Sequence, residues 1–163
     1  MYRIPFSGPS FEPRTYEFHV DDTFFAAFNY EEITHCDINI NVHLEKTERF
    51  LKLDIHFSGD YFVPCDRCLD PIQTLVNHDE QLIVNFGMEN DFDSEVWTIS
   101  AKEHELNLET FIYETLVLLR PFSAMHDIKN CNPKMLAQLQ APPASKPDND
   151  PRWDALKSLM NKE

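Results

Sequence analysis

Apolar and polar residues alternate along residues 37–57, and this alternation is the clearest structural signal in the chain. A period of two is that of a half-buried β-strand, because successive side chains of a strand point to opposite faces. A short charged segment, residues 45–49, divides the pattern, so we predict two strands joined as an antiparallel hairpin. The apolar positions are Ile38, Ile40, Val42 and Leu44 in the first strand, and Leu51, Leu53, Ile55 and Phe57 in the second.

Weaker alternation elsewhere predicts three more strands and one short helix. The strands are expected at 16–20, over 72–86 with a bend near His78, and at 96–99. The short helix is expected at 24–28, because Asp21, Asp22 and Thr23 offer side chains that accept hydrogen bonds from the free N–H groups of a first turn.

One longer helix is predicted over Asn107–Leu119, with Asn107 as N-cap and Pro121 ending it. Its apolar positions recur at spacings of three and four, and Val117 and Leu118 widen the stripe, so we expect the last turn to be largely buried. The fold class predicted is α+β, a mainly antiparallel β-sheet covered by one long helix, with short C-terminal helices. The stripe comprises Leu108, Phe111, Ile112, Leu116 and Leu119.

The C-terminal part of the chain changes in composition. Asn132 followed by Pro133 predicts the start of a short helix, and Asp150 followed by Pro151 predicts another. Between them, residues 141–149 are rich in proline and are typical of a linker. We therefore expect a single α+β domain over 1–140, a linker over 141–149 and a helical tail over 150–163. The apolar positions of the tail are Trp153, Leu156, Leu159 and Met160.

The formal net charge of −14, from 28 acidic and 14 basic residues, narrows the classes of partner. Such a chain repels nucleic acid over most of its surface and attracts basic proteins, such as ribosomal proteins, although acidity also serves solubility alone. No apolar run is long enough to span a membrane, and the N-terminus lacks the apolar core of a signal peptide. We therefore expect a cytoplasmic protein with no membrane contact and reduced thiols.

Cys65 and Cys68 form a Cys-x-x-Cys turn between two predicted strands, which is typical of half a structural zinc site. His126 and Cys131, after the long helix, are candidates for the other two ligands of the tetrahedron. Cys36 has no partner motif and is expected to be a buried thiol. The sequence thus favours zinc held by Cys65, Cys68, His126 and Cys131.

Other interpretations of these cysteines remain open. Cys65 and Cys68 are also compatible with ordinary half-buried thiols or with a redox pair, although a thioredoxin-like motif opens a helix and here Pro71 and β-prone residues 72–76 follow. The motifs GxSxG, HExxH and a glycine-rich phosphate loop are absent, and four protein ligands leave zinc no position for water. The acidic segment 89–95 is expected to be solvated, and no catalytic residue is predicted.

The order of motifs resembles that of the YceD family, bacterial proteins named for accumulation of the large-subunit ribosomal RNA. The similarity runs from about residue 15 to the end and is closest to members from Bacteroidetes-like bacteria. The similarity rests on the stretch 62–69 around Cys65, the strand ending at Phe86-Gly87, the acidic segment, the helix with its exit to His126 and Cys131, and the tail 150–159. Many members carry a second Cys-x-x-Cys where this chain has His126 and Cys131.

The resemblance implies a non-enzymatic factor for synthesis, processing or stability of large-subunit (23S) rRNA. Its expected partner is a basic ribosomal protein or a large-subunit assembly intermediate, and no small-molecule substrate is expected. Trp153, Leu156 and Leu159 are candidates for docking in a groove of that partner. One alternative is direct rRNA binding through Arg49, Lys52 and Arg67. The other is a zinc- or thiol-dependent redox or hydrolytic enzyme.

Overall fold

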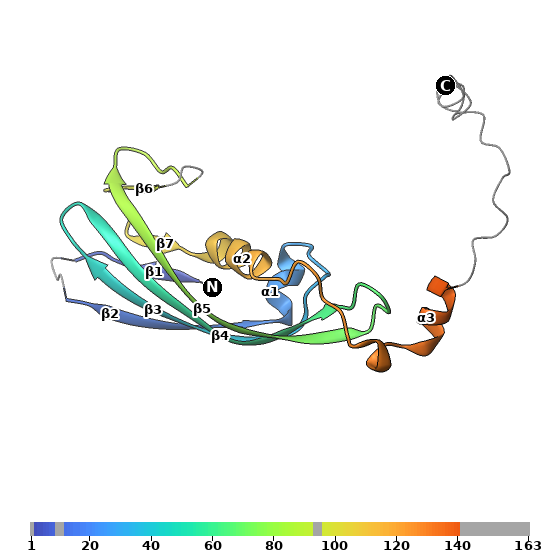
Figure 1. The fold of residues 1–163 in the computed structure, drawn as a ribbon. Helices are drawn as coiled ribbons and strands as arrows, with labels where there is room; N and C mark the ends of the chain where they lie inside the picture. The colour runs from blue at the N-terminus through green and yellow to red at the C-terminus, as the bar shows by residue number, and fades with distance from the viewer. Residues whose placement is uncertain (1, 9–11, 93–95, 141–163) are drawn as a thin grey trace, which may run out of the picture. The chain divides into compact units, whose positions relative to one another are not determined.

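The computed structural model describes residues 2–8, 12–92 and 96–140. The chain divides into two compact units, Met1–Cys131 and Asn132–Glu163, and each is considered by itself. The first unit contains the β-sheets, the helices α1 and α2, and all four cysteines (Figure 1). Of the second unit, only residues 132–140 are described.

A five-stranded mixed sheet forms the body of the first unit, in the order β2-β3-β4-β5-β6. The first four strands are antiparallel neighbours, whereas β6 runs parallel to the end of β5. A separate two-stranded sheet pairs β1 with β7. The strands are β1 (Arg3–Pro5), β2 (Arg14–Asp21), β3 (Thr34–Lys46), β4 (Phe50–Pro64), β5 (Pro71–Gly87), β6 (Trp97–Ser100) and β7 (Glu105–Asn107).

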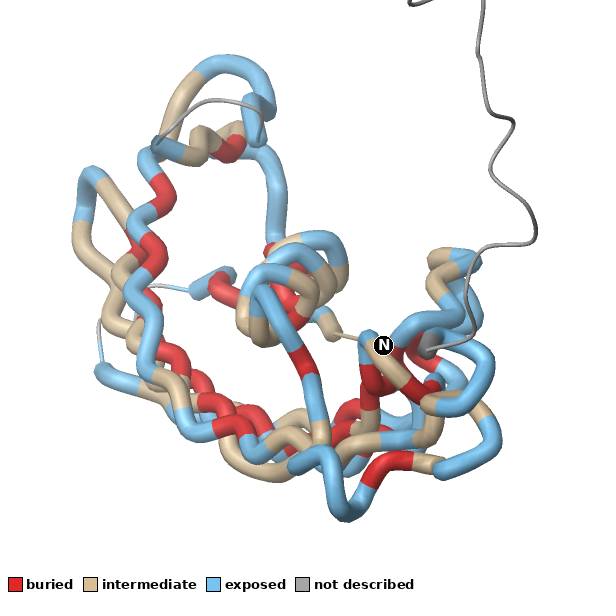
Figure 2. Tube along the Cα trace, turned by 45° about the vertical axis from the view of Figure 1, so that its right-hand side comes forward, coloured by how far each residue is buried: buried red, intermediate tan, exposed pale blue. Residues whose placement is uncertain are grey.

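The predicted hairpin is confirmed, because β3 and β4 pair in antiparallel register from Lys46 opposite Leu51. Buried and less buried residues alternate along both strands, as Figure 2 shows along the sheet. The predicted apolar positions of the hairpin are all buried and face the core. The opposite, outer face of the sheet therefore carries the polar half of the alternation.

Among its described residues, the first unit has two α-helices. Helix α1 (Asp22–Ala27) overlaps the predicted helix at 24–28 but begins two residues earlier, because the carboxylate of Asp21 accepts a hydrogen bond from the Thr23 N–H at 2.9 Å. Helix α2 (Glu109–Leu118) lies over the concave face of the sheet (Figures 1 and 2). Its Ile112 and Leu116 are fully buried in the same core cluster as the strands.

The prediction of one long covering helix is wrong. Helix α2 has ten residues, because Asn107 belongs to strand β7, and its last residue Leu118 is 83% exposed rather than buried. The pairing of β7 with β1, in which Leu106 faces Ile4, takes up the residues that would extend the helix at its start. The sheet, predicted to be mainly antiparallel, is mixed, because β6 runs parallel to β5 while the other neighbouring pairs are antiparallel.

In the second unit, α3 (Pro133–Gln140) begins as predicted, and the side chain of Asn132 accepts a hydrogen bond from the Lys134 N–H at 3.1 Å. The predicted linker over 141–149 and the tail over 150–163 lie outside the described residues, as do Trp153, Leu156 and Leu159. No helix among the described residues is both long and apolar enough to cross a membrane.

Candidate metal centre

The Cys-x-x-Cys turn joins β4 to β5, where Pro64 faces Pro71. The N–H of Cys65 donates to the carbonyl of Asp70, and the N–H of Leu69 donates to the carbonyl of Cys65, both at 2.9 Å. Leu69 adopts a left-handed backbone conformation with φ of 62°, which an L-residue other than glycine or asparagine rarely takes. This conformation closes the turn tightly.

Hydrogen bonds fasten the loop after α2 to this turn. The N–H of Asp66 donates to the carbonyl of Ala124 at 2.8 Å, and the Asp66 carboxylate accepts from the Ala124 N–H at 2.9 Å. The guanidinium of Arg67 donates to the carbonyl of His126 at 3.3 Å. These bonds bring His126 close to Cys68, although the two residues are 58 positions apart in the sequence.

A short 3-10 helix (Ile128–Asn130) turns the chain back after His126. The N–H of Cys131 donates to the carbonyl of Asp127 at 3.2 Å, so Cys131 returns toward the turn. The Cys131 sulfur lies 3.8 Å from the carbonyl oxygen of His126. The 3-10 helix thereby places His126 and Cys131 on the same side of the loop.

The structure brings all four predicted ligands together. One ligand atom from each of Cys65, Cys68, His126 and Cys131 lies within 4.8 Å of the others. The Cys68 sulfur is 3.4 Å from Nδ1 of His126. A tetrahedral zinc with Zn–S of about 2.3 Å and Zn–N of about 2.0 Å separates its ligand atoms by about 3.5–3.8 Å. The four ligand atoms therefore need to move only slightly closer together to coordinate such an ion.

The surroundings of the Cys65 sulfur favour a thiolate. Burial opposes the charge, but hydrogen bonds from the backbone N–H groups of His126, Cys68 and Arg67 outweigh it and lower the pKa of Cys65 to about 6. The Arg67 N–H lies 3.5 Å from the sulfur. Backbone donors at a cluster of thiolates disperse negative charge.

The pKa values of His126 and Cys131 are shifted by the same cluster. Hydrogen bonding to Cys68 and Cys65 raises the pKa of His126, because the imidazolium is stabilised beside thiolates. Burial, followed by hydrogen bonding to Cys68 and Cys65, raises the pKa of Cys131 to about 11. A metal requires a neutral imidazole and deprotonated thiols, so binding at this cluster releases protons and weakens as the pH falls.

The chemistry of the donor set fits a structural ion. Three sulfurs and one imidazole nitrogen form a complete tetrahedral set, whereas a catalytic zinc keeps a position for water. The three cysteines are buried, at 0% exposure for Cys65, 2% for Cys68 and 5% for Cys131. All four cysteines of the chain are free thiols, and Cys36 lies outside the cluster with a buried sulfur.

Comparison with protein families places this chain in a known family. The sequence model of the large ribosomal RNA subunit accumulation protein YceD matches residues 53–160, more than half of the chain. The chain belongs to the YceD family. The match includes all four candidate ligands, and the family is named for ribosomal RNA accumulation rather than for a reaction. No match was found among curated proteins or among solved structures.

In this YceD family member, the three basic candidates for rRNA contact do not form one patch. Arg49 lies at the β3–β4 hairpin and Arg67 at the far end of β4, which is 15 residues long. At about 3.3 Å per residue, roughly 45 Å of strand length separates the two positions. Arg67 also donates to the carbonyl of His126.

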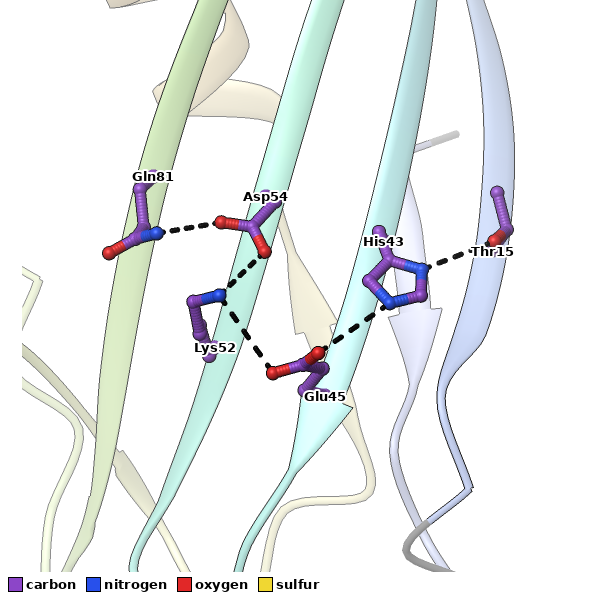
Figure 3. Close-up of polar contacts among 6 residues, drawn as sticks. All are labelled: Thr15, His43, Glu45, Lys52, Asp54 and Gln81. Carbon is purple, nitrogen blue, oxygen red and sulfur yellow. Dashed lines mark hydrogen bonds and ion pairs between the residues drawn. The ribbon is translucent and has the colours of Figure 1, made fainter.

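Lys52, the third candidate, is engaged on the outer face of the sheet (Figure 3). Its ammonium lies 2.8 Å from the carboxylate of Asp54 and 3.8 Å from that of Glu45. These pairs continue across the strands to form a polar row that ties β2 to β5, although such exposed contacts are individually weak. The remaining contacts are Thr15 to His43 at 3.5 Å, His43 to Glu45 at 3.8 Å and Gln81 to Asp54 at 2.7 Å.

Sequence reasoning missed Asp66 as a member of this site. Its carboxylate holds the loop through the Ala124 N–H and through the hydroxyl of Ser123, which donates at 3.2 Å. The residue stands between the two cysteines, but an acidic residue in a turn does not indicate which distant segment it contacts. Only the tertiary arrangement of the loop identifies this role.

Proposed function

We propose that this chain is a zinc-stabilised, non-enzymatic factor that supports accumulation of the large-subunit rRNA by binding a basic ribosomal protein or a large-subunit assembly intermediate. The observation that carries the proposal is family membership over 53–160, a span that contains the complete Cys65, Cys68, His126 and Cys131 cluster. The assigned step is synthesis, processing or stability of that rRNA, and the expected compartment is the cytoplasm.

In this proposal the zinc holds two segments in register. One is the β4–β5 turn, and the other is the loop that leaves α2. Both segments leave large apolar side chains such as Leu69, Phe122 and Ile128 exposed instead of packed, so a metal would supply cohesion that packing does not. The ion would act on the fold and would take no part in a reaction.

The surface charge supports a basic partner. The outer face of β2–β5 carries Lys52 as its single Lys or Arg, and this cation is already paired with carboxylates. A surface of one sign attracts the opposite sign and accelerates association. The carboxylates on this face belong to Glu17, Asp21, Asp37, Glu45, Asp54, Asp60 and Asp79.

Affinity purification from cell extract, followed by mass spectrometry and RNA sequencing, tests the proposal. We expect large-subunit ribosomal proteins or large-subunit precursors to be enriched with the wild-type protein. The variant Cys65→Ser should recover less, whereas Cys36→Ala, which alters a buried thiol outside the cluster, should recover as much. Recovery of neither large-subunit proteins nor precursors by the wild type would refute the proposal.

The C-terminal tail completes the proposal, with Trp153, Leu156 and Leu159 as a second contact to the partner. Substituting these three residues by Ala should weaken the capture without changing zinc content. Direct rRNA binding through Arg49, Lys52 and Arg67 is distinguished in the same experiment. RNA recovered without ribosomal protein, with a recovery that falls as salt is added, would favour that alternative.

A further inference from the structure

Strand β5 presents a long unpaired edge. It pairs with β4 over Pro71–Asn85, but its other side meets β6 only from Val84 to Gly87. Among the described residues, no backbone hydrogen bond connects 71–83 to any segment other than β4. Figure 1 shows β6 alongside only one end of β5. Exposed strand edges are templates for a further strand, and proteins usually protect them.

The hydrogen-bond pattern identifies which backbone groups point outward. The Cys65 N–H donates to the Asp70 carbonyl and the Phe86 N–H donates to the Arg49 carbonyl, and both pairs belong to the register of the β4–β5 ladder. Bonded and non-bonded pairs alternate in an antiparallel ladder. The free N–H and C=O groups therefore belong to the odd-numbered residues Gln73, Leu75, Asn77, Asp79, Gln81 and Ile83.

Strand β5 has few of the features, such as charges and prolines, that usually prevent a sheet edge from pairing with another strand. Residues 72–77, Ile-Gln-Thr-Leu-Val-Asn, include neither a charge nor a proline, and Leu75 is 79% exposed. The opposite edge strand, β2, is shorter, and the N-terminal arm accompanies it, with the Tyr2 hydroxyl donating to the His19 carbonyl at 3.0 Å. The two edges of the sheet therefore differ in their capacity to accept a strand.

The charged residues beside the β5 edge indicate which kind of added strand it would bind. Asp79 and Glu80 are the only charged residues of β5, and Asp60 and Asp54 lie on the neighbouring strand opposite Leu75 and Gln81. A second copy of the chain would bring another net charge of −14, which opposes self-association. An extended segment with lysine or arginine is favoured instead, because its cations meet these carboxylates while its backbone completes the ladder.

We propose that the β5 edge, residues 73–83, binds a partner protein by β-strand addition and that the added strand is an extended basic segment. The ribosomal identity of that partner rests on the proposed function, but the edge and its chemistry do not. The partner's backbone would pair with the outward groups of Gln73 to Ile83. Its basic side chains would meet Asp79 on the outer face of the sheet, and its apolar side chains would lie on the opposite face, beside Val76 and Leu82.

A proline at Asn77 tests the edge without breaking the sheet. The Asn77 N–H points away from β4, so Asn77→Pro removes a donor needed by an added strand and none used by β4. Asn77→Thr keeps the donor and is the matched control. Thermal unfolding of both variants establishes that the sheet is intact, and if Asn77→Pro does not fold, Leu75→Pro at another outward position replaces it.

The probe is a labelled peptide of about ten residues in which Lys alternates with Thr or Val, with a second peptide carrying Glu in place of Lys. We expect the full-length wild type and Asn77→Thr to bind the Lys peptide, Asn77→Pro to bind it about tenfold more weakly, and the Glu peptide to bind to none. Hydrogen exchange should slow at the odd-numbered amides from Gln73 to Ile83 in the complex.

Equal binding of the Lys peptide to Asn77→Pro and the wild type would overturn the proposal, because attraction would then depend on charge alone. Dimers of the wild type that Asn77→Pro abolishes would also overturn it, by assigning the edge to a second copy. Capture of large-subunit material by Asn77→Pro at the wild-type level would refute the edge and leave the proposed function standing. Failure of the wild type to capture such material would refute the proposed function, whereas the peptide measurement would still test the edge.

Discussion

Asp66 and Ala124 bond to each other twice, once through the Asp66 N–H to the Ala124 carbonyl at 2.8 Å and once through the Ala124 N–H to the Asp66 carboxylate at 2.9 Å. This reciprocal pair joins the Cys-x-x-Cys turn to the loop that carries His126. The two halves of the candidate metal site are therefore held together by protein contacts as well as by any ion.

The first prediction concerns this pair. Asp66→Ala removes the acceptor for the Ala124 N–H and the Ser123 hydroxyl, and we expect it to lower the free energy of unfolding by about 1–2 kcal/mol. Zinc should also exchange faster with a chelator. Glu114→Ala, on the exposed side of α2, is the control and should change neither quantity. Unchanged stability and unchanged exchange in Asp66→Ala would contradict the role assigned to the pair.

The left-handed conformation of Leu69 gives a second prediction. With φ of 62°, the backbone at Leu69 is strained for a residue with a bulky side chain, and the side chain is 66% exposed. Leu69→Asn should raise the free energy of unfolding by about 0.5–1 kcal/mol, because asparagine tolerates this conformation. Leu69→Ala removes the same apolar side chain without relieving the backbone strain. Chemical denaturation should therefore rank Asn above Ala, and the reverse order would argue against strain at this position.

The sequence was sufficient to predict the elements whose signals are local. Strict alternation located β3 and β4, capping side chains indicated a helix close to α1, and Asn132 located the start of α3. The clustering of the four candidate ligands was also predictable, because a zinc site restricts both the residue types and the spacing of the first pair.

The missed features depend on contacts between distant segments. Strands β1 and β7 are three residues long, too short to show a period, and they form only because Ile4 meets Leu106 across most of the unit. The end of α2 is apolar on several sides, so the pattern cannot say which residues face the core, and Leu118 is exposed. The anchoring role of Asp66 has no sequence signal for the same reason.

A third prediction concerns a buried hydroxyl. Tyr61 is fully buried, and its hydroxyl has no hydrogen-bond partner among the described residues. Burial, with smaller effects of Tyr30 and Cys36, raises the pKa of Tyr61 to about 12, so the group stays protonated. Tyr61→Phe removes an unsatisfied polar atom and should leave the free energy of unfolding unchanged or raise it by about 1 kcal/mol.

Tyr16→Phe is the matched control, because the Tyr16 hydroxyl donates to the Pro5 carbonyl at 2.9 Å. That variant should lose about 0.5–1 kcal/mol in chemical denaturation. A loss in Tyr61→Phe larger than the loss in Tyr16→Phe would mean that the Tyr61 hydroxyl has a partner in solution.

A fourth prediction separates Cys36 from the cluster by its reactivity. Burial, reinforced by Asp22 and Asp21, raises the pKa of the Cys36 thiol to about 12. Since the thiolate is the nucleophile, iodoacetamide at mildly alkaline pH should leave Cys36 unmodified in the native protein. With a chelator present, Cys65, whose pKa is lowered to about 6, should become reactive, and with zinc it should be protected. Rapid labelling of Cys36 in the folded, zinc-loaded protein would contradict its assigned environment.

The central claim is that Cys65, Cys68, His126 and Cys131 form one structural zinc site, and native mass spectrometry tests it most directly. We expect one tightly held zinc per chain in the wild type and in Cys36→Ala, and none in Cys65→Ser or His126→Ala at the same zinc concentration. Zinc should be released as the pH falls, because protons compete for the imidazole and the thiolates. A folded wild-type protein that takes up no zinc, or equal zinc in all four proteins, would contradict the account.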